Sequence, residues 1–117
     1  MSIFELTDGL LTTLDVPYYE GQPEFEDEPP PVFISYNVYD VPGFWGCGEE
    51  LYTTYYLTLN IYTTGSDKAT VADNLSVALT ALLTENGFIR QSGNYGLSDD
   101  FPKYYHRIIE FNYSREL

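Results

Sequence analysis

The sequence predicts an α+β domain, in which a mostly antiparallel sheet of about four strands packs against one long amphipathic helix and a short N-terminal helix. Apolar and polar residues alternate over 32–39 and again over 51–62, which is the period of a strand with one buried face. Over residues 69–85, apolar residues recur at spacings of three and four, the period of an amphipathic helix. A chain of 117 residues with 44% hydrophobic content fits a single domain, residues 1–117, with one core.

The first 31 residues predict a short helix followed by a loop. Apolar side chains fall at helical spacing over residues 2–14, with Ser2 as the N-cap, whereas Gly9 weakens the helix. Proline, glycine and five acidic residues predict an acidic, proline-rich loop over residues 17–31. Such a loop is ordinarily a solvated surface segment, and the alternative is an acidic lip that faces DNA or a partner.

Residues 32–63 predict an extended hairpin that turns in a glycine-rich segment at 42–48. In its second strand, the odd positions from 51 to 61 are mostly aliphatic and predict a face turned toward the core. The even positions carry tyrosine, threonine and asparagine, and none of them is charged. At about 3.3 Å per residue, a strand over residues 50–63 spans roughly 46 Å, which exceeds the ~35 Å diameter of a compact domain of this length. We therefore expect the hairpin to bend, bulge or protrude.

The helix predicted over residues 69–85 ends at Asn86-Gly87, where the glycine suits the left-handed conformation that commonly follows a helix. Residues 88–91 predict a short strand, and residues 103–113 predict a last strand. The predicted core positions are Val71, Leu75, Ala78, Leu79, Leu82 and Leu83 in the helix, and Tyr105, Ile109 and Phe111 in the last strand.

The chain is strongly acidic, with a formal net charge of -13 at pH 7. Such a surface disfavours sequence-specific binding of nucleic acid, because that binding depends on Lys and Arg displacing counterions. An uncovered strand without charges also lacks the usual defence against pairing with another chain. We therefore predict that a second copy of the chain covers the uncharged strand face. The predicted interface residues are Tyr52, Thr54, Tyr56, Thr58, Asn60 and Tyr62.

Trp45, in the turn of the hairpin, has two interpretations. It is either an anchor of the same interface or a loop aromatic folded back on its own core. Tyrosine is favoured at interfaces because it combines a large apolar area with a polar tip, and the chain has 12 tyrosines against one tryptophan.

The residues predict no enzymatic activity, no cofactor and no metal site. Cys47 and His106 could act as nucleophile and base, but an activated thiolate needs a positive neighbourhood and this chain is acidic. The ordinary interpretation is a turn cysteine and a solvent-facing histidine. One His and one Cys do not make a zinc site, and the acids at 24–28 and 99–100 lack the spacing of a calcium loop. No Lys or Ser/Thr follows the glycines of 43–48 at P-loop spacing.

Membrane and export signals are not expected either. No stretch approaches the roughly 20 apolar residues of a membrane span. Glu5 and Asp8 stand where a secretion signal would be basic. The single cysteine excludes an intrachain disulfide, which fits a reducing compartment.

Several stretches follow one another in a familiar order over roughly residues 1–113: a short helix, an acidic loop, a hairpin ending in IYTTGSD, the helix ATVADNLSVALTALLTENGF and the strand YYHRIIEFNY. This order resembles that of the small tail-completion, tail-terminator and tail-to-head joining proteins of long-tailed bacteriophages. The resemblance implies a virion protein, made in the host bacterial cytoplasm, that forms a hexameric ring at the head-proximal end of the tail tube. Its implied partners are other copies of itself and other phage tail or connector proteins, and the ring would line a channel for DNA.

A second class of function is an acidic inhibitor that mimics the charge of DNA and binds another protein. Such a protein needs carboxylates at phosphate-like intervals along one face. Here the acids cluster in 20–28, 49–50 and 99–100, which disfavours this alternative. In a ring, by contrast, acidic walls would let DNA slide rather than stick.

Overall fold

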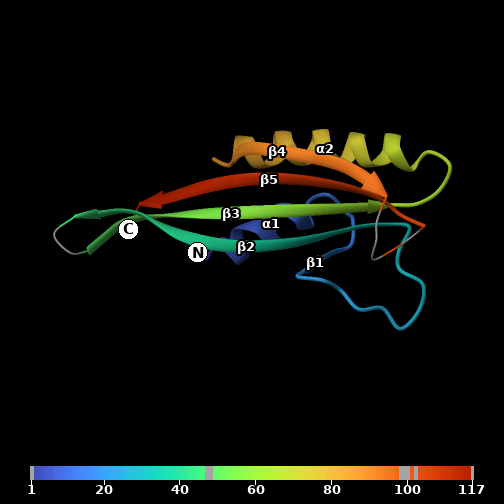
Figure 1. Ribbon diagram of the computed structural model, residues 1–117, viewed down its shortest axis with the longest axis horizontal. Helices are drawn as coiled ribbons and strands as arrows, with labels where there is room; N and C mark the ends of the chain where they lie inside the picture. Colours follow the sequence, from blue (N-terminus) through green and yellow to red (C-terminus); the bar gives the residue numbers. More distant parts are fainter. Residues whose placement is uncertain (1, 47–48, 98–100, 102, 117) are drawn as a thin grey trace.

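Two helices cover one face of a five-stranded sheet in the computed structural model of the chain (Figure 1). The structure describes residues 2–46, 49–97, 101 and 103–116. The predicted α+β class is therefore confirmed. The elements in chain order are α1 (Ile3–Thr12), β1 (Tyr18–Glu20), β2 (Val32–Gly46), β3 (Glu49–Thr63), α2 (Lys68–Glu85), β4 (Ile89–Leu97) and β5 (Tyr105–Glu116).

The sheet has the strand order β1-β2-β3-β5-β4 and is mixed rather than purely antiparallel. Strand β1 lies inside the predicted loop 17–31 and pairs in parallel with β2, so the prediction of four strands was too low. The backbone N–H of Ile34 donates to the carbonyl oxygen of Pro17 at 2.9 Å, and that of Gly21 donates to Tyr36 at 2.8 Å. A three-residue strand is too short to show the alternation by which strands are recognised in a sequence.

Strand β4 continues to Leu97, well beyond the predicted end at residue 91, and β5 continues to Glu116. The extension of β4 contains Gly93 and Gly96, which resemble a loop in the sequence but pair with β5. A Cβ atom at Gly93 would overlap the guanidinium of Arg107, which is 3% exposed. The glycine therefore makes room for a buried arginine on the neighbouring strand.

The hairpin of β2 and β3 is long and irregular near its tip. The pairing register shifts between Pro42 and Phe44 and again between Phe44 and Trp45. Strand β2 extends to Gly46, which lies inside the segment predicted as a turn. The molecule measures 55 × 28 × 24 Å, and the hairpin extends beyond both helices along the longest axis (Figure 1). The expected bulging and protrusion are both present.

The core lies between the helices and the odd positions of β3. Leu57, Leu59 and Ile61 are at most 1% exposed, and Ile109 and Phe111 of β5 lie beside them at 0%. The helices close this layer with the buried residues Ile3 and Leu11 of α1 and Ala72, Leu79 and Leu83 of α2.

The buried face of α2 is rotated relative to the predicted stripe. Ala78 is exposed, whereas Ala72 and Ser76 are buried. Val71, Leu75 and Leu82 are half-buried at the margins of the contact. Small residues at the contact let the helix backbone approach the sheet closely, which a pattern of apolar residues alone does not reveal.

Both helices have the ends that their sequences favour. The Ser2 hydroxyl accepts from the backbone N–H of Glu5, and the Glu5 carboxylate accepts from that of Ser2, which makes a capping box. At the end of α2, Gly87 has a φ of +92° and the N–H of Phe88 donates to the carbonyl of Leu83. Within the described ranges, neither helix has the length and apolar character needed to cross a lipid bilayer.

A hydrogen bond between side chains joins helix α1 to strand β2 of the sheet. The Tyr36 hydroxyl donates to Asp8 Oδ1 at 2.8 Å, and Tyr36 is only 1% exposed. Burial raises the pKa of Tyr36 above its ordinary value, and the adjacent Asp8 carboxylate raises it further. The neutral, hydrogen-bonded form of this tyrosine therefore belongs to the folded state.

Two glycines should respond oppositely to replacement by alanine. Gly87→Ala should lower the free energy of unfolding by about 1–2 kcal/mol, because a left-handed conformation crowds a Cβ atom. Gly9→Ala should raise it by about 0.5–1 kcal/mol, because no atom lies within 4 Å of the added methyl group in α1. Urea unfolding followed by circular dichroism measures the free energy of unfolding of both variants. The same change in both would contradict the left-handed conformation of Gly87 and the helical, uncrowded position of Gly9.

Tyr36→Phe should lower the free energy of unfolding by about 1–3 kcal/mol at neutral pH, because the hydrogen bond to Asp8 is lost. Above about pH 10 the unfolded wild type ionises this tyrosine while the folded state holds it neutral, since its folded pKa is raised. As the pH rises above about 10, the difference in the free energy of unfolding between the wild type and Tyr36→Phe should therefore shrink by up to ~1.4 kcal/mol per pH unit. A difference between the two proteins that stays constant with pH would contradict this environment.

Candidate functional site

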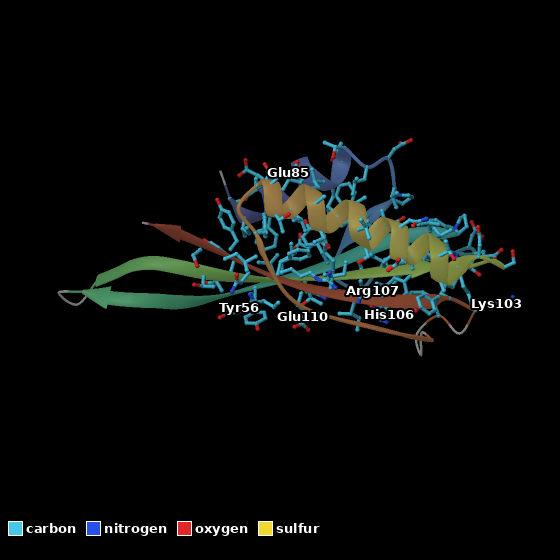
Figure 2. The ribbon with its side chains drawn as sticks, turned by 90° about the horizontal axis from the view of Figure 1, so that it is seen from above. Tyr56, Glu85, Lys103, His106, Arg107 and Glu110 are labelled. Atoms are coloured by element: carbon cyan, nitrogen blue, oxygen red, sulfur yellow. The ribbon has the colours of Figure 1, made fainter. Side chains whose placement is uncertain are left out.

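The candidate site is the outer face of the sheet, which is the face turned away from both helices. The even positions of β3 point to this side, together with the odd positions of β2. Figure 2 shows Tyr56, His106 and Glu110 on the side of the sheet opposite α2. The outer face therefore contains the even positions of β3, which are the residues predicted to form the interface.

One end of the outer face is covered by the chain itself. An aromatic cluster, made of Phe33, Tyr62 and Tyr104 with partly buried residues around them, fills this end. The rings of Phe33 and Tyr62 stack with their centroids 4.8 Å apart, and Tyr62 is 2% exposed. The prediction that Tyr62 belongs to a subunit interface was therefore wrong. The partly buried members of the cluster are Tyr19, Phe25 and Phe101.

The cover comes from the acidic loop and from the segment before β5. Phe25 packs edge-on against Phe33, with centroids 5.2 Å apart, and so brings the loop onto the sheet. The Tyr104 hydroxyl lies 2.9 Å from the carbonyl oxygens of both Pro29 and Pro30, and this contact holds the proline run in place. Burial raises the pKa of Tyr104, and the charge of Glu28 adds to this effect. The loop is thus packed against the sheet in its middle, at Phe25, and near its end, at Pro29 and Pro30.

His106 is a structural residue at the border of this cluster. Its ring stacks on Tyr62 with centroids 4.4 Å apart, and its Nε2 atom donates to Asn60 Oδ1 at 2.8 Å. It lies on the predicted outer face, but it is half-buried rather than solvent-facing. Asn60 likewise has a partner within its own chain. Cys47, the other half of the nucleophile pair considered from the sequence, lies outside the described residues.

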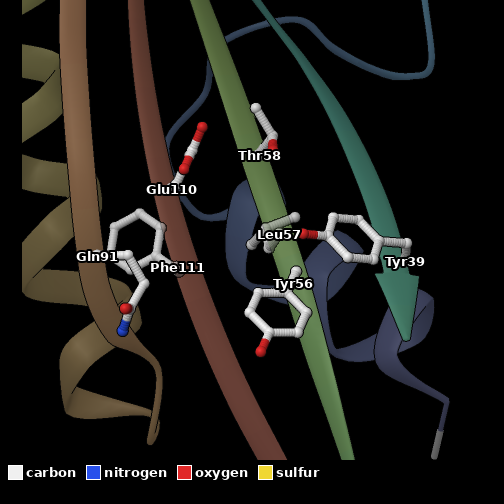
Figure 3. A pocket seen from close by; sticks show the side chains of 7 residues that line it. All are labelled: Tyr39, Tyr56, Leu57, Thr58, Gln91, Glu110 and Phe111. Atoms are coloured by element: carbon white, nitrogen blue, oxygen red, sulfur yellow. The ribbon is translucent and has the colours of Figure 1, made fainter. Parts of the chain in front are cut away.

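The middle of the outer face is open. Tyr39 of β2 is 59% exposed and stacks on Tyr56 of β3, with centroids 4.9 Å apart and ring planes 13° from parallel. Toward β5 and β4, these rings border a groove of about 310 Å³ (Figure 3). Among the described lining residues, Glu110 alone carries a charge. The groove is lined by Tyr39, Tyr56, Leu57, Thr58, Gln91, Glu110 and Phe111.

Beyond the groove, in the direction of the hairpin tip, the described outer face continues with the uncharged side chains of Thr54 and Ser114. Thr54 of β3 is half-buried, and its hydroxyl lies 3.1 Å from the Ser114 hydroxyl of β5. We call Tyr39, Thr54, Tyr56 and Thr58, together with the groove, the open patch. The side chains of Tyr52 and Trp45 lie outside the described part of the structure, so their predicted roles stay predictions.

Of the groove residues, the sequence analysis predicted only Tyr56 and Thr58 as site residues. It missed Tyr39, Gln91 and Glu110 on the outer face, as well as the buried Leu57 and Phe111. The alternation in β2 places Tyr39 opposite the core, but only the pairing of Tyr39 with Tyr56 brings it to the interface strand. Gln91 lies at a register shift between Arg90 and Ser92, which no sequence pattern indicates.

No arrangement suited to a metal ion occurs among the residues described. No group of three or more His, Cys, Asp or Glu side chains gathers there. No family model matches the chain, and a search of curated proteins finds no significant relative.

Two tyrosines of β3 should differ sharply in their contribution to stability. Tyr62→Ala should lower the free energy of unfolding by about 3–5 kcal/mol, because it opens a cavity in the aromatic cluster. Tyr56→Ala should cost only about 1 kcal/mol, because Tyr56 is half-exposed and stacks on the exposed ring of Tyr39. Both are measured by urea unfolding, and a similar loss in the two variants would show that Tyr56 also belongs to the core.

Proposed function

We propose that the chain is a ring-forming structural protein of a bacteriophage tail, acting as a tail terminator or as a head-to-tail joining protein. The order of its elements resembles that of these proteins. The observation that carries the proposal is the open patch: a nearly uncharged surface of tyrosine and threonine in a chain of net charge -13. The open patch is the surface that another copy covers.

Electrostatics restricts where two copies of this chain can touch. Both carry the same excess of acid, and like charges at contact distance repel strongly when they lose water. A contact through the open patch places few acids against one another. Tyrosine also contributes a large apolar area and loses little conformational freedom, which favours it at interfaces.

A ring of such subunits would do mechanical rather than catalytic work. Six equal bodies in a touching ring leave a central hole about as wide as one body, and the two shorter axes of this chain are 28 and 24 Å. A hole of this width passes a DNA duplex. The acids that face it would repel the phosphates, so that DNA moves through without binding. The flat ends of the ring would stop tube growth and contact the head connector.

Charges placed in the open patch should prevent assembly without unfolding the subunit. In the Tyr56→Asp/Thr58→Asp variant, both substitutions lie at half-exposed positions, so the circular dichroism spectrum should stay that of the wild type. The mass measured by light scattering should fall from that of an oligomer to that of a monomer. Gln22→Glu adds one charge at an exposed position of the acidic loop and should leave the oligomer intact. Loss of folding in the double variant would assign this face to the core.

The place of the chain in a virion is tested separately. Mass spectrometry of purified phage particles should detect it at a few copies per particle, as expected for one ring. Its absence from the particle would remove the tail assignment and leave the acidic inhibitor of another protein as the remaining class. Binding of a second protein by the monomer, with no self-association, is the result that would favour the inhibitor.

A further inference from the structure

The structure also carries a candidate partner for the groove. We propose that the groove binds the solvent face of α2 from a second copy, so that subunits join head to tail. The solvent face of α2 is defined here by exposed residues on the side of the helix away from the core. This inference rests on the proposed function, because it names what covers the open patch. The residues of the solvent face are Asn74, Val77, Ala78, Ala81 and Thr84.

The solvent face of α2 is unusual for an exposed helix in an acidic chain. The side of a helix that faces water is normally rich in charged residues. Here the span from Asn74 to Thr84 has none, and it is bounded by Asp73 and Glu85. At about 1.5 Å per residue, the uncharged span is roughly 16 Å long. At its centre, Val77 is 64% exposed, the highest value among the large hydrophobic residues whose exposure the structure describes.

Shape favours a helix as the occupant of the groove. The groove is concave, with the stacked rings of Tyr39 and Tyr56 on one side and Gln91 on the other (Figure 3). Two copies of this groove placed face to face would enclose empty volume, which forfeits dispersion contacts. A helix is convex, and the alanines beside Val77 let its backbone come close to the sheet.

Charge favours the same occupant. Glu110 lines the groove, and a face-to-face contact between two open patches brings the Glu110 carboxylates of both copies into one interface. The solvent face of α2 instead offers the side-chain amide of Asn74 as a donor. This amide can hydrogen-bond a carboxylate that has lost water, whereas the Thr84 hydroxyl already donates to the carbonyl oxygen of Thr80 in its own helix.

The consequence for assembly is a specific symmetry. The groove and the solvent face of α2 lie on opposite sides of the sheet (Figure 2). Each subunit therefore uses one surface to receive its neighbour and the other to reach the next, which is a heterologous contact. Such contacts close into rings, or continue as filaments when the rotation does not close.

Cysteine cross-linking tests this contact in the full chain. In a Cys47→Ser background, the Thr58→Cys/Val77→Cys variant is treated with a short bifunctional maleimide and resolved on a denaturing gel. We expect a ladder of dimers, trimers and larger species. An equal mixture of the Thr58→Cys and Val77→Cys single variants should give dimers only. Each single variant alone should stay monomeric, and so should the double variant carrying the added charge Gln91→Glu in the groove.

The outcomes separate this contact from the proposed function. Dimers of Thr58→Cys alone would indicate a face-to-face contact, which overturns the α2 assignment and keeps self-association through the open patch. No cross-link in a chain that light scattering finds oligomeric would likewise overturn only the α2 contact. No cross-link in a chain that stays monomeric at its highest attainable concentration would overturn both.

Discussion

Strand β3 has one face that two helices bury and one face that they leave uncovered, and this difference organises the molecule. The aliphatic odd positions, with Leu59 and Ile61 fully buried, hold α1 and α2 on a single side. Every large side chain on the other side must then be covered by a loop, by another chain or by water. Apolar area left in water is unfavourable at about 25 cal/mol per Å². The apolar area of the outer face therefore favours a loop or a partner that covers it.

The chain itself covers one end of the outer face. The acidic loop crosses one end of the outer face because Phe25 has the cluster of Phe33 and Tyr62 to pack against, and its proline run is held by Tyr104. Charged residues of the loop stay in water while its one phenylalanine is inserted. The open patch is what remains beyond the reach of this loop. Its tyrosines are amphipathic, which makes them compatible with water in the monomer and with a partner in an assembly.

The sequence predicts those parts that depend on period, and it misses those that depend on contact between distant residues. The alternation of β3 and the recurrence of apolar residues at spacings of three and four in α2 predict the fold class directly. Strand β1 has only three residues, and β4 contains Gly93, whose missing side chain leaves room for the guanidinium of Arg107 on β5. The division of the outer face into a covered end and an open middle also depends on contacts between distant residues, so the sequence does not predict it. Tyr62 and Tyr56 have the same residue type and the same phase on one strand. They differ because the rings of Phe33 and Phe101 pack on Tyr62.

Whether the open patch is covered by another copy can be measured residue by residue. Hydroxyl-radical footprinting followed by mass spectrometry reports the solvent exposure of Tyr39 and Tyr56 as a function of protein concentration. If copies cover this surface, oxidation of both rings should fall as concentration rises, while oxidation of Phe4, exposed on α1, should stay constant. Oxidation of Tyr39 that is independent of concentration, in the free protein and in purified particles alike, would contradict the account.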